Sequence, residues 1–116
     1  MTGAPSPGQD FGGQDIIVLA GQARKASDLL KALSHETRLL ILWLLSENEK
    51  SVSELEDLLA LPQATVSQQL ARLRLDDLVS TRREGRVIHY SITDPEVSAV
   101  VTSLYDLLCD PEEAAH

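Results

Sequence analysis

The chain has 116 residues, a formal net charge of −8 and one cysteine. This length predicts one domain, the lone cysteine excludes a disulfide framework, and the longest apolar run, Leu39–Leu45, is far shorter than the ~20 residues of a membrane-spanning helix. The first Lys or Arg is Arg24, so no positively charged secretory leader is visible, and we expect a reduced cytoplasmic protein with no membrane partner. The negative charge argues against nucleic acid as a partner unless the contact face is locally positive.

Glycine and proline are frequent in residues 1–14, which have little to bury, so a disordered N-terminal tail is expected there. One folded domain is expected over residues 15–110, with a C-terminal tail at 111–116. At the start of this domain, apolar residues near helical spacing predict a first helix from about Asp15 to Leu33.

Caps mark the next two helices. Ser34 fits the N-cap of a second helix over about 35–46, whose leucine-rich run indicates burial on most sides. Ser53 predicts the start of a third, short helix through a capping box with Glu56, and this helix has to end before Pro62.

A fourth helix is predicted over about 63–75, almost directly after the third. Two short helices joined by a tight turn are typical of a helix-turn-helix. The β-branched segments Val79–Arg83 and Arg86–Ile92 then predict a hairpin, since Gly85 between them supplies a positive φ.

Asp94 caps a last predicted helix, with Pro95 at its first position. Its apolar stripe is wider than a small monomer can cover, so we expect a homodimer, although the helix could instead cap the monomer core. A two-fold protein suits an inverted-repeat DNA site. The expected fold is mainly α with a small β-hairpin: a winged helix-turn-helix flanked by N- and C-terminal dimerisation helices.

The outward face of the fourth helix has the composition of a DNA reader. Small and hydrogen-bonding side chains occur there, and no acidic residue lies between Pro62 and Leu75. Gln can pair with adenine and Arg with guanine, while Ser and Thr can bind bases or phosphates. The alternative is an ordinary solvated polar face. The DNA-binding residues predicted on this helix are Gln63, Thr65, Ser67, Gln68, Gln69 and Arg72.

The hairpin adds Arg82, Arg83 and Arg86, which suit phosphate or minor-groove contacts unless they form only a solvated basic turn. Residues 62–92 carry a net charge of +2 and the rest of the chain −10. The negative net charge of the chain therefore does not exclude DNA binding, because the helix-turn-helix and hairpin segment 62–92 is positive. Double-stranded DNA is the expected partner.

The segments "KALSHETRLLILWLL", "SVSELEDLLALPQATVSQQLARLR" and "LVSTRREGRVIHYSI" resemble the ArsR/SmtB family of bacterial winged-helix repressors. The resemblance implies a homodimer held by its first and last helices. It also implies repression at an inverted-repeat operator in a promoter, with release by an inducer. In the matching recognition helix, relatives often carry His at the position of Gln69.

The resemblance also bears on what is sensed. Arsenic-type sensors carry a Cys-x-Cys pair where this chain has Ser51 and Ser53, and zinc-type sensors carry His where it has Glu96 and Leu107. Hydroxyls do not replace thiolates for soft metals, so no metal site and no cofactor are expected.

The segments "SVSELE", "TRREGR" and "LYDLLC" resemble most closely the dithiol repressors, which sense persulfides and oxidants. Cys109 matches the second cysteine of that group, whereas Trp43 stands at the first. Our hypothesis is that the dithiol response has been lost.

Cys109 keeps three interpretations: an inert packing residue, the sensor thiol of a single-thiol redox- or persulfide-responsive repressor, or a partner of Cys109 in another subunit. Nearby Asp106 and Asp110 and the helix C-terminus disfavour a thiolate.

Two other classes of protein are alternatives to a DNA-binding repressor. No nucleophile-base motif or phosphate loop surrounds the three histidines, so an enzyme is not expected. A winged-helix protein-interaction module without DNA binding is the second alternative, and the non-acidic helix and the arginines of the hairpin argue against it. The sequence therefore predicts a transcriptional repressor.

Overall fold

A computed structural model of the chain describes residues 15–109. The tails expected at 1–14 and 111–116 lie outside the described residues. Packing divides the chain after Lys31 into two units. The elements are α1 (Ile16–Leu33), α2 (Glu36–Glu47), β1 (Lys50–Ser51), α3 (Val52–Leu59), α4 (Gln63–Leu75), β2 (Val79–Glu84), β3 (Val87–Ile92) and α5 (Pro95–Leu108).

The first unit consists, in its described part, of most of α1. The helix begins beside Asp15, whose carboxylate accepts a hydrogen bond from the backbone N–H of Ile17 at 2.8 Å. Its apolar residues Ile16, Val18 and Leu30 are exposed. The helix predicted over about 15–33 is confirmed. Several of its apolar side chains are exposed to solvent.

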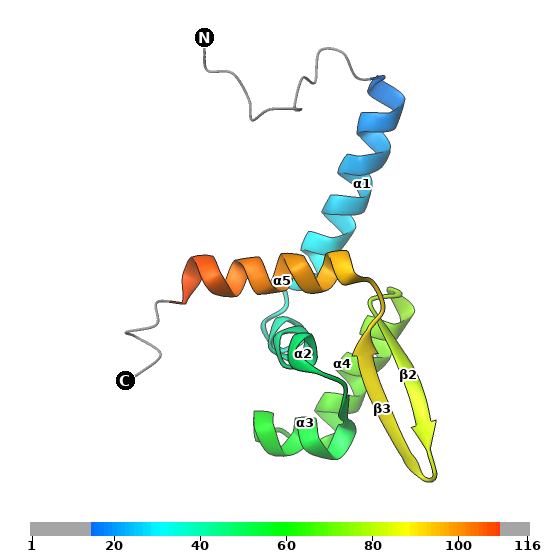
Figure 1. The fold of residues 1–116 in the computed structure, drawn as a ribbon, viewed down its shortest axis with the longest axis vertical. Helices are drawn as coiled ribbons and strands as arrows, with labels where there is room; N and C mark the ends of the chain where they lie inside the picture. The colour runs from blue at the N-terminus through cyan, green and yellow to red at the C-terminus, as the bar shows by residue number, and fades with distance from the viewer. Residues whose placement is uncertain (1–14, 110–116) are drawn as a thin grey trace. The chain divides into compact units, whose positions relative to one another are not determined.

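The second unit packs its helices around one apolar core. Figure 1 shows α5 lying across α2, with α3 and α4 on the other side of α2. The side chains at the centre of this core come from α2, α3, α4 and α5, so each of these helices contributes at least one. They are Ile41, Leu42, Leu55, Val66, Leu70, Leu73 and Val101.

A three-stranded antiparallel sheet lies beside these helices, in the order β1-β3-β2. The β2–β3 hairpin is predicted by the sequence, whereas β1 is not, because a strand of two residues is too short for a periodic pattern. Lys50 in β1 is buried, and its ammonium group donates hydrogen bonds to the carbonyl of Leu44 at 2.8 Å and to Asn48 Oδ1 at 2.9 Å. The buried charge is thereby satisfied at the C-terminal end of α2.

Two predicted caps are wrong. The capping box of α3 is formed by Ser51 and Glu54, not by Ser53 and Glu56: Ser51 Oγ accepts from the Glu54 N–H at 3.2 Å, and Glu54 Oε1 accepts from the Ser51 N–H at 2.9 Å. Because β1 pairs with β3 up to Ser51, the chain leaves the sheet directly into the helix.

The N-cap of α2 is His35 rather than Ser34, and it makes no side-chain capping hydrogen bond. His35 keeps extended backbone angles, φ −96° and ψ 119°, so the helix begins one residue later than predicted, at Glu36.

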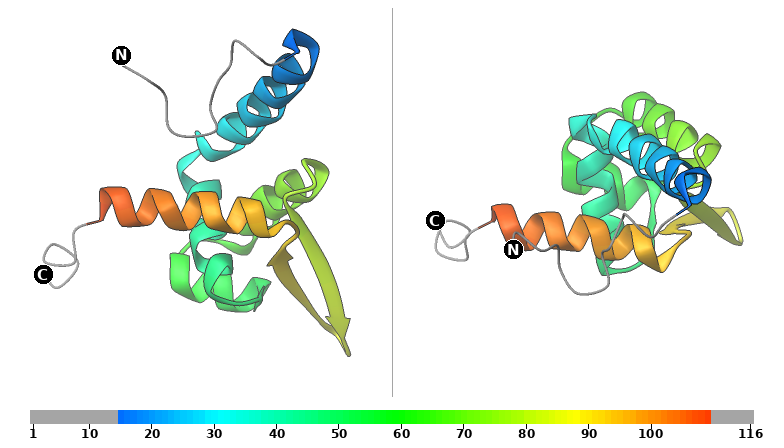
Figure 2. Two further views of the ribbon diagram at one scale, coloured as in Figure 1. Left: turned by 45° about the horizontal axis from the view of Figure 1, so that its top comes forward. Right: turned by 90° about the horizontal axis from the view of Figure 1, so that it is seen from above.

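The remaining elements confirm the sequence prediction to within one residue: β2 continues to Glu84, and β3 begins at Val87 rather than Arg86. α4 has the expected bounds, and α5 begins at Pro95 after Asp94, whose carboxylate accepts from the Glu96 N–H at 2.8 Å. The hairpin turns at Gly85, which has φ +63°. Figure 2 shows the hairpin projecting beyond the neighbouring helices. The fold is the expected winged helix-turn-helix, in which α3 and α4 form the motif and β2–β3 the wing.

Candidate nucleic-acid interface

Helix α4 is fixed in place by one apolar stripe. Val66, Leu70 and Leu73 are completely buried, and the helix packs against α3, α2 and β2. Burial of such a stripe fixes the rotation of the helix about its axis. The opposite face is therefore presented to solvent in one orientation.

That outer face carries the predicted DNA-reading side chains with different exposures. Gln63, Gln68 and Arg72 are exposed, whereas Thr65, Ser67 and Gln69 are half-buried. The small residues Ala64 and Ala71 are exposed beside them. Small side chains allow the helix axis to approach base edges closely, and the longer side chains next to them can reach those edges.

Arg72 has one partner within α4 and its cap. Its Nε lies 3.6 Å from Asp76 Oδ2, an exposed i,i+4 ion pair. Exposed pairs of this kind contribute only ~0–1 kcal/mol, so the guanidinium group can exchange the carboxylate for a base edge or a phosphate.

At the tip of the wing, two arginines flank the turn. Arg83 and Arg86 are exposed, and Arg83 Nε donates to the carbonyl of Gly85 at 3.3 Å. Within residues 15–109 the structure records no ion pair for either side chain. Their positive charges are thus unneutralised by neighbouring carboxylates at the most projecting part of the unit.

Arg82 differs from these two arginines. Its Nε donates to Glu49 Oε2 at 3.2 Å, its Nη2 donates to Glu49 Oε1, and its Nη1 donates to Glu84 Oε2 at 3.4 Å. The hydrogen bonds from Arg82 lower the pKa of Glu49 below its ordinary value of 4.5, and Glu49 in turn raises the pKa of Arg82. Glu49 is not predicted from the sequence as a partner of Arg82, because 33 positions separate the two residues and no local pattern connects them.

The contact between α2 and α5 is built around Trp43. Its indole Nε1 donates to the carbonyl of Val101 at 2.6 Å, and its ring meets that of Tyr105 edge to face, with the centroids 5.9 Å apart. A half-buried indole N–H with a hydrogen-bond partner and an edge-to-face aromatic pair both stabilise a contact. Trp43 therefore joins α2 to the middle of α5.

Cys109 lies at the C-cap of α5. It is half-buried, and its backbone N–H donates to the carbonyl of Tyr105 at 2.8 Å. In the described part of the chain, no three or more His, Cys, Asp or Glu side chains are grouped so that they could hold a metal ion. No helix among the described residues is long and apolar enough to span a bilayer.

Comparisons with known proteins agree with this geometry. A family model described as "Bacterial regulatory protein, arsR family" matches residues 35–81. The chain is 45% identical over 89 residues to the transcriptional activator HlyU of Vibrio cholerae, covering 77% of this chain and 82% of that protein. It is 40% identical over 94 residues to the biofilm growth-associated repressor of Xylella fastidiosa, covering 81% and 82%.

Solved structures give the same result. HlyU from Vibrio cholerae has a TM-score of 0.74 to this chain at 45% identity, covering 77% of this chain and 97% of that one. The transcriptional repressor BigR from Xylella fastidiosa has a TM-score of 0.76 at 37% identity, covering 84% and 99%. Both the sequence and the backbone arrangement of most of the chain are thus shared with known transcriptional regulators.

Proposed function

The chain belongs to the ArsR family of bacterial DNA-binding transcriptional regulators, and from this premise we propose that it is a homodimeric repressor of an inverted-repeat operator. The observation that carries the proposal is the surface of α4 and the wing. Its polar, non-acidic face is held by a fully buried stripe and lies next to Arg83 and Arg86, which have no ion-pair partner among residues 15–109. It is a regulator and not an enzyme.

The proposed contacts fall into two groups. The side chains of α4 read base edges in the major groove, with Arg72 as the guanine reader. Arg83 and Arg86 bind phosphates or enter the minor groove from the wing. The proposed contacts on α4 are Gln63, Thr65, Ser67, Gln68, Gln69 and Arg72.

Binding of a promoter fragment, selected from genomic DNA with the protein itself, tests this proposal. The affinity should fall steeply as salt rises, because phosphate contacts release counterions. Arg72→Ala should cost about 1–3 kcal/mol on the cognate site and relax the preference at one base pair. Arg86→Ala should weaken binding about equally on all sequences and reduce the salt slope by about one.

Arg74→Ala is the matched control, since it removes the same charge from another side of α4. It should change affinity without changing base preference. Binding that ignores salt, or no binding to any genomic fragment, would instead favour a protein-interaction module. Equal losses from Arg72→Ala and Arg86→Ala on every sequence would show that Arg72 does not read a base.

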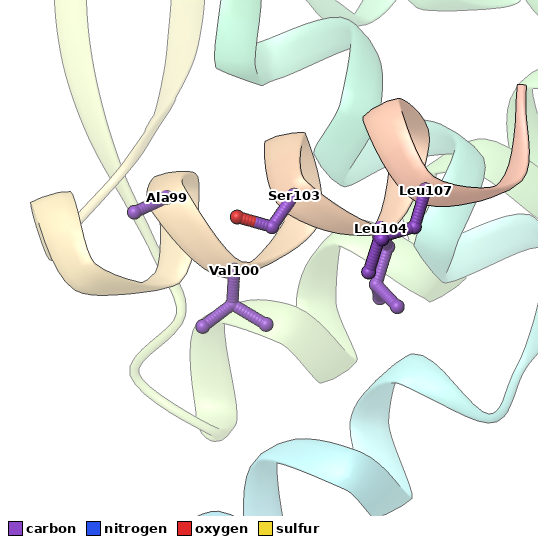
Figure 3. Close-up of a pocket in the computed structure, with 5 residues that line it drawn as sticks. All are labelled: Ala99, Val100, Ser103, Leu104 and Leu107. Carbon is purple, nitrogen blue, oxygen red and sulfur yellow. The ribbon is translucent and has the colours of Figure 1, made fainter. Parts of the chain in front are cut away.

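The dimer proposal follows from the outer side of α5. A shallow apolar groove runs along this helix (Figure 3), and Val100 and Leu107 on it are exposed. Helix α1 presents further exposed apolar residues. We assign a second copy of the chain to these surfaces, because self-association buries them and yields the two-fold symmetry of an inverted repeat. Figure 3 labels the lining residues, which are Ala99, Val100, Ser103, Leu104 and Leu107.

The direction of regulation is the next part of the proposal. One relative is named an activator and another a repressor, and we assign repression because a dimer docked on a promoter excludes the polymerase from the same DNA. We place the protein in the cytoplasm, where bacterial promoters lie. Transcription in vitro from the selected promoter should fall when the protein is added; a rise would make it an activator.

We further propose that no bridge between two sulfurs of one subunit controls this repressor. The chain has one cysteine. Trp43 stands at the position that matches the first cysteine of the dithiol group, and its indole is hydrogen-bonded to α5. Treatment with a persulfide donor should leave the DNA affinity of the wild-type protein unchanged.

The variant Trp43→Cys supplies the missing thiol and should make DNA binding sensitive to the donor. Trp43→Ser is the control, since it removes the indole without adding sulfur and should stay insensitive. If the wild-type protein lost affinity on treatment and Cys109→Ser did not, a single-thiol sensor at Cys109 would replace this proposal.

A further inference from the structure

The wing contains an ion pair that crosses the sheet. Arg82 lies on β2 opposite His89 of β3, and Glu49 directly precedes β1. Because the strand order is β1-β3-β2, the guanidinium group of Arg82 reaches across the middle strand to the carboxylate of Glu49. The pair therefore connects the segment after α2 with the outer strand of the wing.

The geometry of this pair differs from that of a flexible surface contact. Two guanidinium nitrogens, Nε and Nη2, bind the two oxygens of the Glu49 carboxylate. Such a bidentate arrangement fixes direction as well as distance. It constrains β2 at the third residue from its turn end, just before the tip arginine Arg83.

The local charge is unfavourable for a phosphate at Arg82. The guanidinium group contacts two carboxylates, Glu49 and Glu84, so the trio carries a net negative charge. Within the described residues, His89 Nε2 is buried without a hydrogen-bond partner, 3.7 Å from Glu84 Oε1. By contrast, Arg83 and Arg86 have no carboxylate partner among the described residues.

We propose that Arg82 and Glu49 are positioning residues, which anchor the wing so that Arg83 and Arg86 meet the DNA backbone, and that Arg82 does not itself contact DNA. This inference rests on the proposed DNA-binding function. The sequence alone predicts Arg82 as a DNA contact, whereas here Arg82 positions the wing and Glu49 is its partner in doing so. A wing held before binding loses less conformational freedom when the complex forms.

The test measures the affinity for the selected promoter fragment as a function of salt for Arg82→Gln, Glu49→Gln and Arg86→Gln. Both Arg82→Gln and Glu49→Gln should weaken binding by about two- to fivefold, the range of an exposed pair, with the salt slope of the wild type. Arg86→Gln should reduce that slope by about 0.9, the value for one lost phosphate contact.

A charge swap adds a readout that simple loss of folding would not give. The double variant Glu49→Arg with Arg82→Glu keeps the pair with reversed polarity and should recover much of the affinity lost in each single variant. Thermal unfolding of each variant identifies any that do not fold, and Arg82→Lys, which retains the charge without the bidentate geometry, then takes the place of Arg82→Gln. Arg82→Lys should weaken binding at an unchanged slope.

Three outcomes would overturn the inference. The first is a reduction of the salt slope in Arg82→Gln as large as that in Arg86→Gln. The second is tighter DNA binding by Glu49→Gln. Either result would identify Arg82 as a phosphate contact. The third is unchanged affinity in both single variants. Failure of the proposed function is distinct from all three, because the wild-type protein would then show no salt-dependent DNA binding at all.

Discussion

Helices α4 and α5 carry apolar residues at the same helical spacing, yet the fold treats them differently. The stripe of α4, Val66, Leu70 and Leu73, has 0% exposure. On α5 only Val97 and Val101 are buried, while Tyr105, Leu107 and Leu108 toward its C-terminal end remain exposed. Among the described residues, the apolar stripe of α4 is covered completely and that of α5 only in part.

This difference separates two uses of an amphipathic helix. A stripe that the chain covers completely fixes the helix and leaves the other face free for recognition. A stripe that stays uncovered instead exposes apolar surface to water, which favours association. Substitutions in the buried stripe of α4 and in the exposed stripe of α5 test this contrast.

The largest effect is expected in the core beneath α4. Leu70→Ala should reduce the free energy of unfolding by about 2–5 kcal/mol, because it leaves a cavity at a fully buried site. Denaturant unfolding at fixed protein concentration measures this loss. Leu75→Ala, at the exposed end of the same helix, is the control and should change stability by less than about 0.5 kcal/mol. A loss below about 1 kcal/mol for Leu70→Ala would show that the α4 stripe is not tightly packed.

The next effect concerns the uncovered stripe. Leu107 on α5 and Leu75 on α4 are matched, with 80% and 78% exposure. Leu107→Ser should weaken self-association at least about tenfold, the equivalent of losing the burial of part of one leucine, whereas Leu75→Ser should not. Sedimentation over a concentration series measures both. Equal effects of the two substitutions would remove the distinction between the helices.

The contrast also shows what the sequence can predict. The bounds of α4, the start of α5 at Pro95 and the turn at Gly85 follow from local rules, namely periodicity, the restrictions of proline and the positive φ of glycine. The exposed character of the α4 face follows in the same way, because its inward stripe is clear in the sequence.

Features set by contacts between distant segments are not predicted in this way. The pattern Ser-x-x-Glu occurs twice in succession, at Ser51 and at Ser53, and only the pairing of β1 with β3 selects the first. The partner of Arg82 likewise depends on the strand order, which brings Glu49 to it across β3. Local helix-capping propensity is the same for the two Ser-x-x-Glu patterns, so it cannot choose between them. It contains no information about the pairing of Arg82 with Glu49.

The third prediction concerns Ser51, the N-cap of α3. Ser51→Ala should lower the free energy of unfolding by about 1 kcal/mol, because the Glu54 N–H loses its acceptor. Ser53→Ala should leave it nearly unchanged, since Ser53 is exposed inside α3. Denaturant unfolding of the two variants compares the cap positions directly. A larger loss from Ser53→Ala would return the start of α3 to the position expected from the sequence.

The smallest effect concerns the pair of Glu49 and Arg82 in the wing and depends on pH. Hydrogen bonds from Arg82 lower the pKa of Glu49 in the folded protein below 4.5, so the pair stabilises the fold above that value and is lost as the pH falls through the lowered pKa. NMR titration of the Glu49 carboxyl should show this depressed pKa in the wild-type protein and a value closer to 4.5 in Arg82→Gln. Glu54 is an internal control, because the Ser51 backbone N–H, rather than Arg82, lowers its pKa. It should titrate alike in both proteins, so a parallel shift of the two carboxyls would indicate a general change in the sheet instead of the loss of one anchoring pair.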